Sequence, residues 1–267
     1  MSTTADIGLL NLALFLSLLG IPCLFFWRWR MVDLSKDTIV SVLRMTVQLL
    51  LVGFYLRYLF RLDNVFLNIG WLMVMITVAN THIVRRSGLV VSRMFWVTQL
   101  SLMIAVILMV GLFLWILIPD SSLVDARYLI PIAGMVLGNC LQGNIRALDA
   151  YFTELKNNEN AFMADLLQGA TVREASEPAF QKAMRSSIAP NLGNMATLGI
   201  VSLPGMMTGQ MLGGALPLVA AKYQIAIMAA IFMAIVVAIS LNLMLCLRVA
   251  YTPEGLIDKS IFKPEPS

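Results

Sequence analysis

The side chains of this chain best suited to chemistry are thioethers, amides and a thiol, and they lie in two short segments. Thioether sulfur binds soft ions such as Cu(I) readily and Fe(II) less readily. A path for a moving ion needs only weak binding, so such donors suit it without forming a tight site. We predict a path along Asn139, Cys140, Met206, Met207, Gln210 and Met211. The ligands of any metal stay undefined, because most of the 18 Met must simply fill space.

The second of these segments, residues 202–213, contains a predicted helix break. Pro204 lacks a backbone N–H, and lipid offers no water to the carbonyl that is left free. Such breaks are tolerated where the backbone is buried in protein or lines a cavity. Glycines four residues apart let helices approach closely, and they occur at Gly134, Gly138, Gly205, Gly209 and Gly213. We expect the helices that carry them to pack together, although ordinary tight packing produces the same pattern.

The elements that must position these side chains are membrane helices. Apolar residues make up 59% of the 267 residues, charged residues 13%, and the mean hydropathy is +0.83. A water-soluble domain needs far less apolar surface, so the predicted fold class is an all-α polytopic bundle. Runs of about 20 residues predict seven spans, at 7–27, 39–60, 66–84, 94–118, 128–148, 189–212 and 219–247. The fifth span is the weakest, because polar side chains crowd its second half.

Lysine and arginine predict the orientation of the bundle. With the N-terminus outside and the C-terminus inside, Arg44 lies within the second span, near its inner end. The outer side then carries only four of the 19 Lys and Arg, namely Arg57, Arg61, Arg127 and Lys222. This distribution agrees with the positive-inside rule. Nothing basic precedes Arg28, so we expect no cleavable signal peptide.

Catalytic motifs are missing from the chain. Without G-x-x-x-x-G-K-[ST] it has no P-loop with which to hydrolyse ATP. His82 is the only histidine, and no Asp or Glu lies in the middle of a predicted span, which argues against a proton- or sodium-coupled carrier. A membrane-embedded enzyme is a weak alternative, and a purely structural membrane protein is another. Three cysteines fall in apolar runs and are expected to be buried, reduced thiols, namely Cys23, Cys140 and Cys246.

One sizeable polar insert, residues 149–188, interrupts the spans, and the predicted topology places it in the cytoplasm. We predict a helix, a turn capped by Gly169 and a second helix that begins after Thr171. Glu174 follows Thr171 by three residues, which predicts a capping box. A charged helical hairpin between membrane helices is well placed for contact with a soluble partner, although a solvated loop has the same composition.

Three blocks of the chain resemble the FetB family of ABC transporter permeases. The first is I-P-I-A-G-M at 130–135 with G-N at 138–139. The second is L-Q-G-A-T at 167–171 with R-S-S-I at 185–188 and a following proline. The third and most specific is L-G-I-V-S-L-P-G-M-M-T-G at 198–209, followed by K-Y-Q-I at 222–225. The blocks occur in this order, and the resemblance covers nearly the whole chain.

The resemblance implies an ABC permease of the bacterial inner membrane. Residues 1–267 would form a single permease domain, which pairs as a homodimer in the lipid bilayer with a separately encoded P-loop ATPase. Members are described as iron exporters and related plant permeases are associated with aluminium tolerance, so iron leads, while another metal or a small non-metal solute stays open. This chain would bind no cofactor, because ATP-Mg would sit on the partner. Its net charge of +4 comes from loop Lys and Arg and bears on orientation, so we expect no nucleic-acid partner. The contact with the ATPase would involve Asp165, Leu166, Leu167, Gln168, Gly169, Ala170, Thr171 and Arg185.

Overall fold

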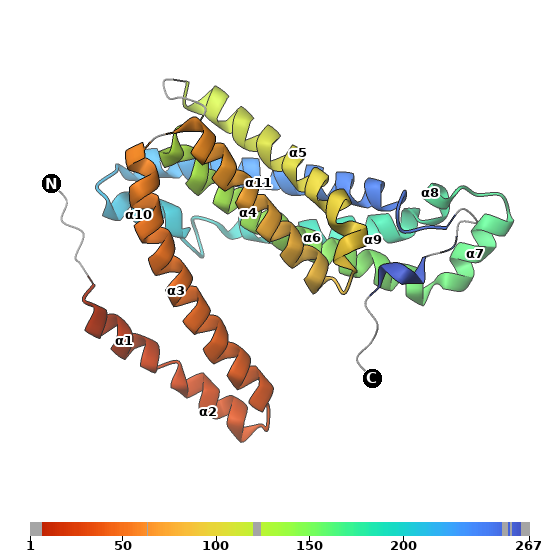
Figure 1. Ribbon diagram of the computed structural model, residues 1–267, viewed down its shortest axis with the longest axis horizontal. Helices are drawn as coiled ribbons and strands as arrows, with labels where there is room; N and C mark the ends of the chain where they lie inside the picture. The colour runs from red at the N-terminus through yellow and green to blue at the C-terminus, as the bar shows by residue number, and fades with distance from the viewer. Residues whose placement is uncertain (1–6, 63, 120–123, 253–255, 257, 263–267) are drawn as a thin grey trace. The chain divides into compact units, whose positions relative to one another are not determined.

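The computed structural model describes residues 7–62, 64–119, 124–252, 256 and 258–262. Within them the chain forms eleven α-helices and one short 3-10 helix, so the all-α class is confirmed. The chain divides into two compact units (Figure 1). Unit 1 comprises Met1–Asp63 with Leu212–Ala215, and unit 2 comprises Asn64–Met211 with Leu216–Ser267. The single permease domain expected from the sequence stays a prediction.

Unit 1 is a hairpin of helices with almost no interior of its own. Helices α1 (Leu9–Ser17) and α2 (Gly20–Arg28) follow each other closely, and α3 (Val32–Leu62) packs against α2. The Ser35 hydroxyl donates a hydrogen bond of 3.1 Å to the Cys23 carbonyl and so links α3 to α2. Leu59 is the one fully buried side chain of α3. Apolar side chains left at the surface are what lipid requires of a spanning helix.

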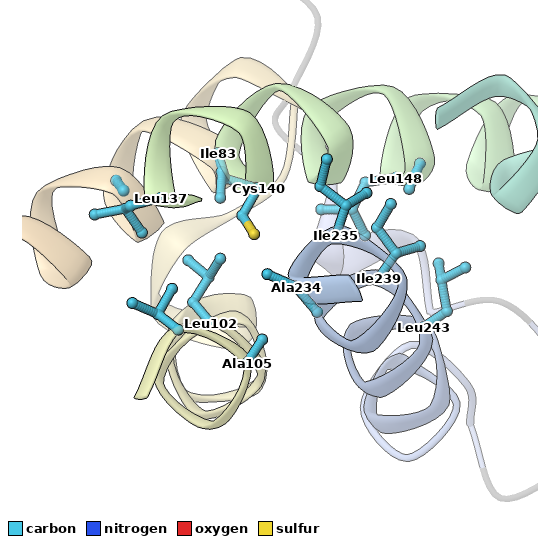
Figure 2. Packing of buried hydrophobic residues seen from close by; sticks show 14 of the residues in the cluster. Ile83, Leu102, Ala105, Leu137, Cys140, Leu148, Ala234, Ile235, Ile239 and Leu243 are labelled. Carbon is cyan, nitrogen blue, oxygen red and sulfur yellow. The ribbon is translucent and has the colours of Figure 1, made fainter. Parts of the chain in front are cut away.

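Unit 2 is built around four long helices. These are α4 (Val65–Arg86), α5 (Val91–Leu117), α6 (Ala126–Asn157) and α11 (Pro217–Cys246), and α9 (Glu177–Thr197) packs against α6 and α11. Figure 2 shows how small and branched side chains of α11 interlock with α5 and α6, where Cys140 faces Leu102 and Ala234. A glycine permits the close approach of α6 to α11, because a Cβ at Gly143 would lie only 3.2 Å from Ile235 Cγ2.

Five segments of the described residues are long and apolar enough to cross a membrane. They are Leu9–Arg28, Val32–Leu62, Val65–Arg86, Val91–Leu117 and Pro217–Cys246. These segments coincide with the predicted spans one to four and seven. The predicted fifth span lies inside α6, which is helical but more polar than the other five. The observed helices therefore support a multi-span membrane protein.

The predicted sixth span, 189–212, is not one continuous helix, as the break expected at Pro204 implies, and its crossing of the membrane stays a prediction. Helix α9 ends at Thr197, and α10 (Gly205–Leu212) begins only after Pro204. Between them Gly199 adopts a φ of 85°, which favours glycine, and its N–H donates to the Ser202 carbonyl at 3.0 Å. The break that Pro204 predicts is confirmed, but a full turn of irregular chain precedes it.

Candidate functional site

The polar hairpin (α7, Glu159–Leu167; the turn 168–171; α8, Val172–Ala175) follows the sequence prediction closely. Gly169 has a φ of 93°, the left-handed conformation that ends a helix. Thr171 and Glu174 form the predicted capping box, with the Thr171 N–H donating to Glu174 Oε2 at 2.8 Å. These hydrogen bonds stabilise the carboxylate and lower the pKa of Glu174. The prediction of a glycine turn and a capped second helix is therefore confirmed.

The tip of the polar hairpin presents an apolar side chain to the surroundings. Leu167, the last residue of α7, is 87% exposed, whereas Phe162, one and a half turns earlier, is buried. Buried Phe162 anchors the helix and so holds Leu167 at the tip. Of the other residues expected to contact a partner, Leu166 and Ala170 are half-buried, and the rest are exposed, namely Asp165, Gln168, Gly169, Thr171 and Arg185.

The base of the polar hairpin is tied between two helices. Lys182 of α9 forms an ion pair with Glu154 of α6, and the lysine side chain is 56% exposed. Arg185 lies almost one turn further along α9 and is exposed. An exposed ion pair of this kind contributes about 0.2–1 kcal/mol. The pair therefore aligns the base more than it stabilises the fold.

A layer of polar side chains, most of them buried, crosses unit 2, and the sequence prediction missed most of it. On one side, Asn80 of α4 donates to the Phe95 carbonyl at 3.0 Å and to Gln99 Oε1 at 2.9 Å. Gln99 in turn donates to the Thr77 hydroxyl at 3.3 Å. Asn80 is fully buried. These hydrogen bonds join α4 to α5.

The same layer continues from α5 through α11 to α6. Asn242 of α11 donates to Asn144 Oδ1 at 2.8 Å and accepts from the Thr98 hydroxyl at 3.4 Å. Asn144 donates to the carbonyl of Cys140 on its own helix. All three of the linked polar side chains are buried. The signal in the sequence that could have indicated this pairing is Asn242, an amide within the long apolar run 219–247. Buried polar groups in spanning helices usually pair with groups on other helices.

The predicted donors on α10 lie close together. Met206, Met207, Gln210 and Met211 are all half-buried on this helix. Met206 packs against the hydrophobic core of unit 2. The Gln210 Oε1 atom is buried and has no hydrogen-bond partner among the described residues. A buried carbonyl oxygen without a donor beside thioethers is chemically suited to receive a cation or a donor group.

The predicted donors on α6 face different ways. Asn139 is half-buried and donates to the Met135 carbonyl of its own helix. Cys140 is fully buried, and its sulfur points into the core that Figure 2 draws. No hydrogen bond between the described residues joins the α6 donors to those of α10. The part of the six predicted donors in a common path therefore stays a prediction.

The predicted packing glycines and the cysteines differ in how closely other side chains surround them. A Cβ at Gly134 would lie 3.5 Å from Met75 of α4, whereas Gly138, Gly205 and Gly209 have open space beside them. Packing through those glycines stays a prediction. Cys140 and Cys246 are buried and all three cysteines are free, but Cys23 is only half-buried, so the expectation of three buried thiols was wrong there. In the described part of the chain, no three His, Cys, Asp or Glu side chains gather as a metal site would require.

Several apolar helices of spanning length define a multi-span helical membrane protein. The chain belongs to the family described as Uncharacterised protein family (UPF0014), which matches residues 9–251. The recognition of the FetB resemblance from the sequence is therefore confirmed.

Three relatives show how far the similarity extends. The UPF0014 membrane protein YjkA of Bacillus subtilis is 34% identical over 72% of this chain and 76% of its own length. The Escherichia coli protein named "Probable iron export permease protein FetB" is 30% identical over 80% of this chain and 81% of its own length. ALUMINUM SENSITIVE 3 of Arabidopsis thaliana is 30% identical over 87% and 84% respectively. No solved structure matches the chain.

Proposed function

We propose that this chain is the permease subunit of an ABC transporter that exports metal ions, with iron the leading cargo. It works as a homodimer in a plasma membrane, with two copies of a separately encoded ATPase that carry ATP-Mg. The observation that carries the proposal is Leu167, which is 87% exposed at the tip of the polar hairpin. An apolar side chain at the tip of a charged hairpin can enter the apolar centre of an interface with a soluble partner. Iron follows from the printed name of the Escherichia coli relative.

The observed helices are long enough for the chain to cross the membrane seven times. Helix α6 has 32 residues and packs against α4, α5 and α11, all of which are of spanning length. At 1.5 Å per residue it is about 48 Å long, which exceeds the roughly 30 Å of a bilayer core. We infer that α6 crosses with its neighbours and that α9 with α10 makes the remaining crossing. An odd number of crossings puts the two termini on opposite sides of the membrane. The positive-inside rule then puts the N-terminus outside and the polar hairpin, with most Lys and Arg, in the cytoplasm.

The broken segment around α10 is the proposed cargo path. Irregular backbone at membrane depth is tolerated where it lines a cavity, and residues Leu198 to Pro204 form such a stretch. The buried Gln210 oxygen without a partner supports this placement. Weak donors of this kind let an ion enter and leave, which suits passage better than storage.

Docking of the ATPase is tested by placing a charge on the hairpin tip. The permease is co-expressed with a candidate P-loop ATPase. Leu167→Asp is compared with Asn160→Asp, which adds the same charge to α7 at an exposed polar position. We expect Leu167→Asp to lower recovery of the ATPase at least tenfold, about 1.4 kcal/mol of binding. Asn160→Asp should leave it unchanged. Equal recovery with both variants would refute docking at this tip.

The cargo is tested by ATP hydrolysis of the complex in lipid nanodiscs with Fe(II), Cu(I), Zn(II) or Al(III) added one at a time. Stimulation by one ion that is lost in the double variant Met206→Leu, Met207→Leu would support both that ion and the path. The matched control is Met233→Leu on α11, an exposed methionine outside the segment. Hydrolysis that no metal alters would reject metal export and favour a small non-metal solute.

A further inference from the structure

The chain makes further contacts with unit 2 beyond the end of α11, its last long helix. After α11 it turns back along unit 2 as a C-terminal strap, described at residues 251–252, 256 and 258–262. The Asp258 N–H donates to the Ala250 carbonyl at 2.9 Å and fixes this return. Ile261 at the far end is fully buried, although it lies outside every long helix. The described residues of the strap therefore pack against unit 2.

One end of the strap contacts the base of the polar hairpin. The Tyr251 hydroxyl lies 2.8 Å from the Tyr151 hydroxyl of α6, a hydrogen-bonding distance. The ring of Tyr251 also lies against Phe162 of α7, with centroids 5.8 Å apart. Burial raises the pKa of Tyr251, so the hydroxyl stays protonated. This end therefore touches the residue that anchors α7.

The other end of the strap contacts the loop that joins α4 to α5. The Val90 N–H donates to the Ile261 carbonyl at 2.7 Å, and Leu89 and Phe262 pair as an isolated antiparallel bridge. Phe262 also meets Phe152 of α6 edge to face, with ring centroids 5.3 Å apart. Val90 is the N-cap of α5, so the contact is made at the start of a long helix.

The match to the UPF0014 family stops at residue 251, the first residue of the strap. The contacts of Ile261 and Phe262 therefore belong to a part of the chain that the family match does not cover. The strap bridges two places that are far apart in the sequence, namely α7 and the α4–α5 loop. A connection through packed side chains and hydrogen bonds at both ends can carry a displacement from one place to the other.

We propose that the C-terminal strap is a positioning element that transmits movement of the polar hairpin to the start of α5. Its role at the hairpin rests on the proposed function, in which the hairpin receives the ATPase. Tyr251 acts through Phe162, and Phe262 acts through Leu89. Binding of a partner at the hairpin tip thereby tightens the α4–α5 loop.

The first test needs neither the partner nor the cargo. Hydrogen–deuterium exchange is measured on the full chain in lipid nanodiscs for Phe262→Asp and for the matched control Leu256→Asp, which adds the same charge at an exposed strap residue. We expect Phe262→Asp to speed exchange at least tenfold both in Glu159–Leu167 and in residues 87–90, with Pro217–Cys246 unchanged as evidence of an intact fold. Phe262→Leu should restore slow exchange. Faster exchange at only one of the two places would overturn the proposal.

The second test measures transmission itself. With the ATPase bound to the wild-type chain, exchange should slow at the hairpin and at residues 87–90 together. In Phe262→Asp the ATPase should still protect the hairpin but no longer residues 87–90. Equal protection of the loop in both proteins would refute transmission through the strap. If the ATPase fails to protect the wild-type hairpin, the proposed function fails, and the first test alone decides whether the strap couples the two places.

Discussion

Gly169 and Gly143 are both glycines of unit 2, but glycine is needed at the two positions for different physical reasons. Gly169 turns the polar hairpin with a φ of 93° and has open space where a side chain would be. Gly143 has no such φ and lies inside α6, where a Cβ would sit 3.2 Å from Ile235 Cγ2 and 3.4 Å from Ile239 Cδ1. The first glycine serves a local backbone conformation, and the second serves contact between distant helices. The hairpin is thus specified locally and the interior non-locally.

The largest effect is expected from filling the contact between α6 and α11. Gly143→Leu would force a branched side chain against Ile235 and should destabilise unit 2 by about 3 kcal/mol. The matched control is Gly138→Leu on the same helix, which has open space beside it and should change the stability of the single chain little. The measurement is the free energy of unfolding in bicelles. Equal losses in the two variants would contradict the non-local role of Gly143.

A smaller loss is expected when the polar layer is broken. Asn242→Leu removes the hydrogen bond to Asn144 and leaves that buried amide without its donor. We expect about 1–2 kcal/mol of destabilisation, the upper range for hydrogen bonds between membrane helices. A double-mutant cycle with Asn144→Leu checks the pairing, because the second substitution should add much less than it does alone. Strict additivity would mean that the two amides do not interact.

The contrast between the two glycines also explains what the sequence could predict. Thr171, Glu174 and Gly169 lie within six residues, so their pattern alone predicts the capped turn that the structure shows. Asn144 and Asn242 are 98 residues apart, and their pairing depends on how α6 and α11 meet. The two amides can be read from the sequence, but the contact between them cannot be predicted from it.

The sequence also did not predict which face of a helix points into the core. Asn139 and Cys140 are neighbours, yet about 100° separates neighbouring side chains around a helix. One of them is half-buried and the other fully buried in the core. The proline at 204 correctly predicted a break, but the preceding turn depends on Gly199, and a single apolar run concealed it. Apolar length predicts that a helix spans, but not which side faces its neighbours.

Gly169→Ala tests the local side of the comparison. An L-residue in the left-handed conformation costs about 1–2 kcal/mol, and the neighbouring space offers no compensating contact. We expect faster hydrogen exchange in residues 168–171 and no change in α11. Gly169→Asn is the matched control, since asparagine tolerates this conformation better. Faster exchange in α11 of Gly169→Ala as well would mean that the turn is coupled to the core and is not local.

The smallest effect should come from Thr171→Ala. Loss of the N-cap oxygen should speed exchange in α8 about fivefold at pH 7, the usual scale of a lost cap. The capping box also makes α8 sensitive to pH. The pKa of Glu174 is lower in the folded hairpin than its ordinary value of 4.5, so its carboxylate stabilises α8 above that value. This contribution disappears as the pH falls through the lowered pKa. Exchange in α8, measured in steps from pH 7 to pH 3 and corrected for intrinsic rates, should therefore rise more in the wild type than in Thr171→Ala. Identical pH dependence in the two proteins would show that the box does not hold Glu174 as a carboxylate.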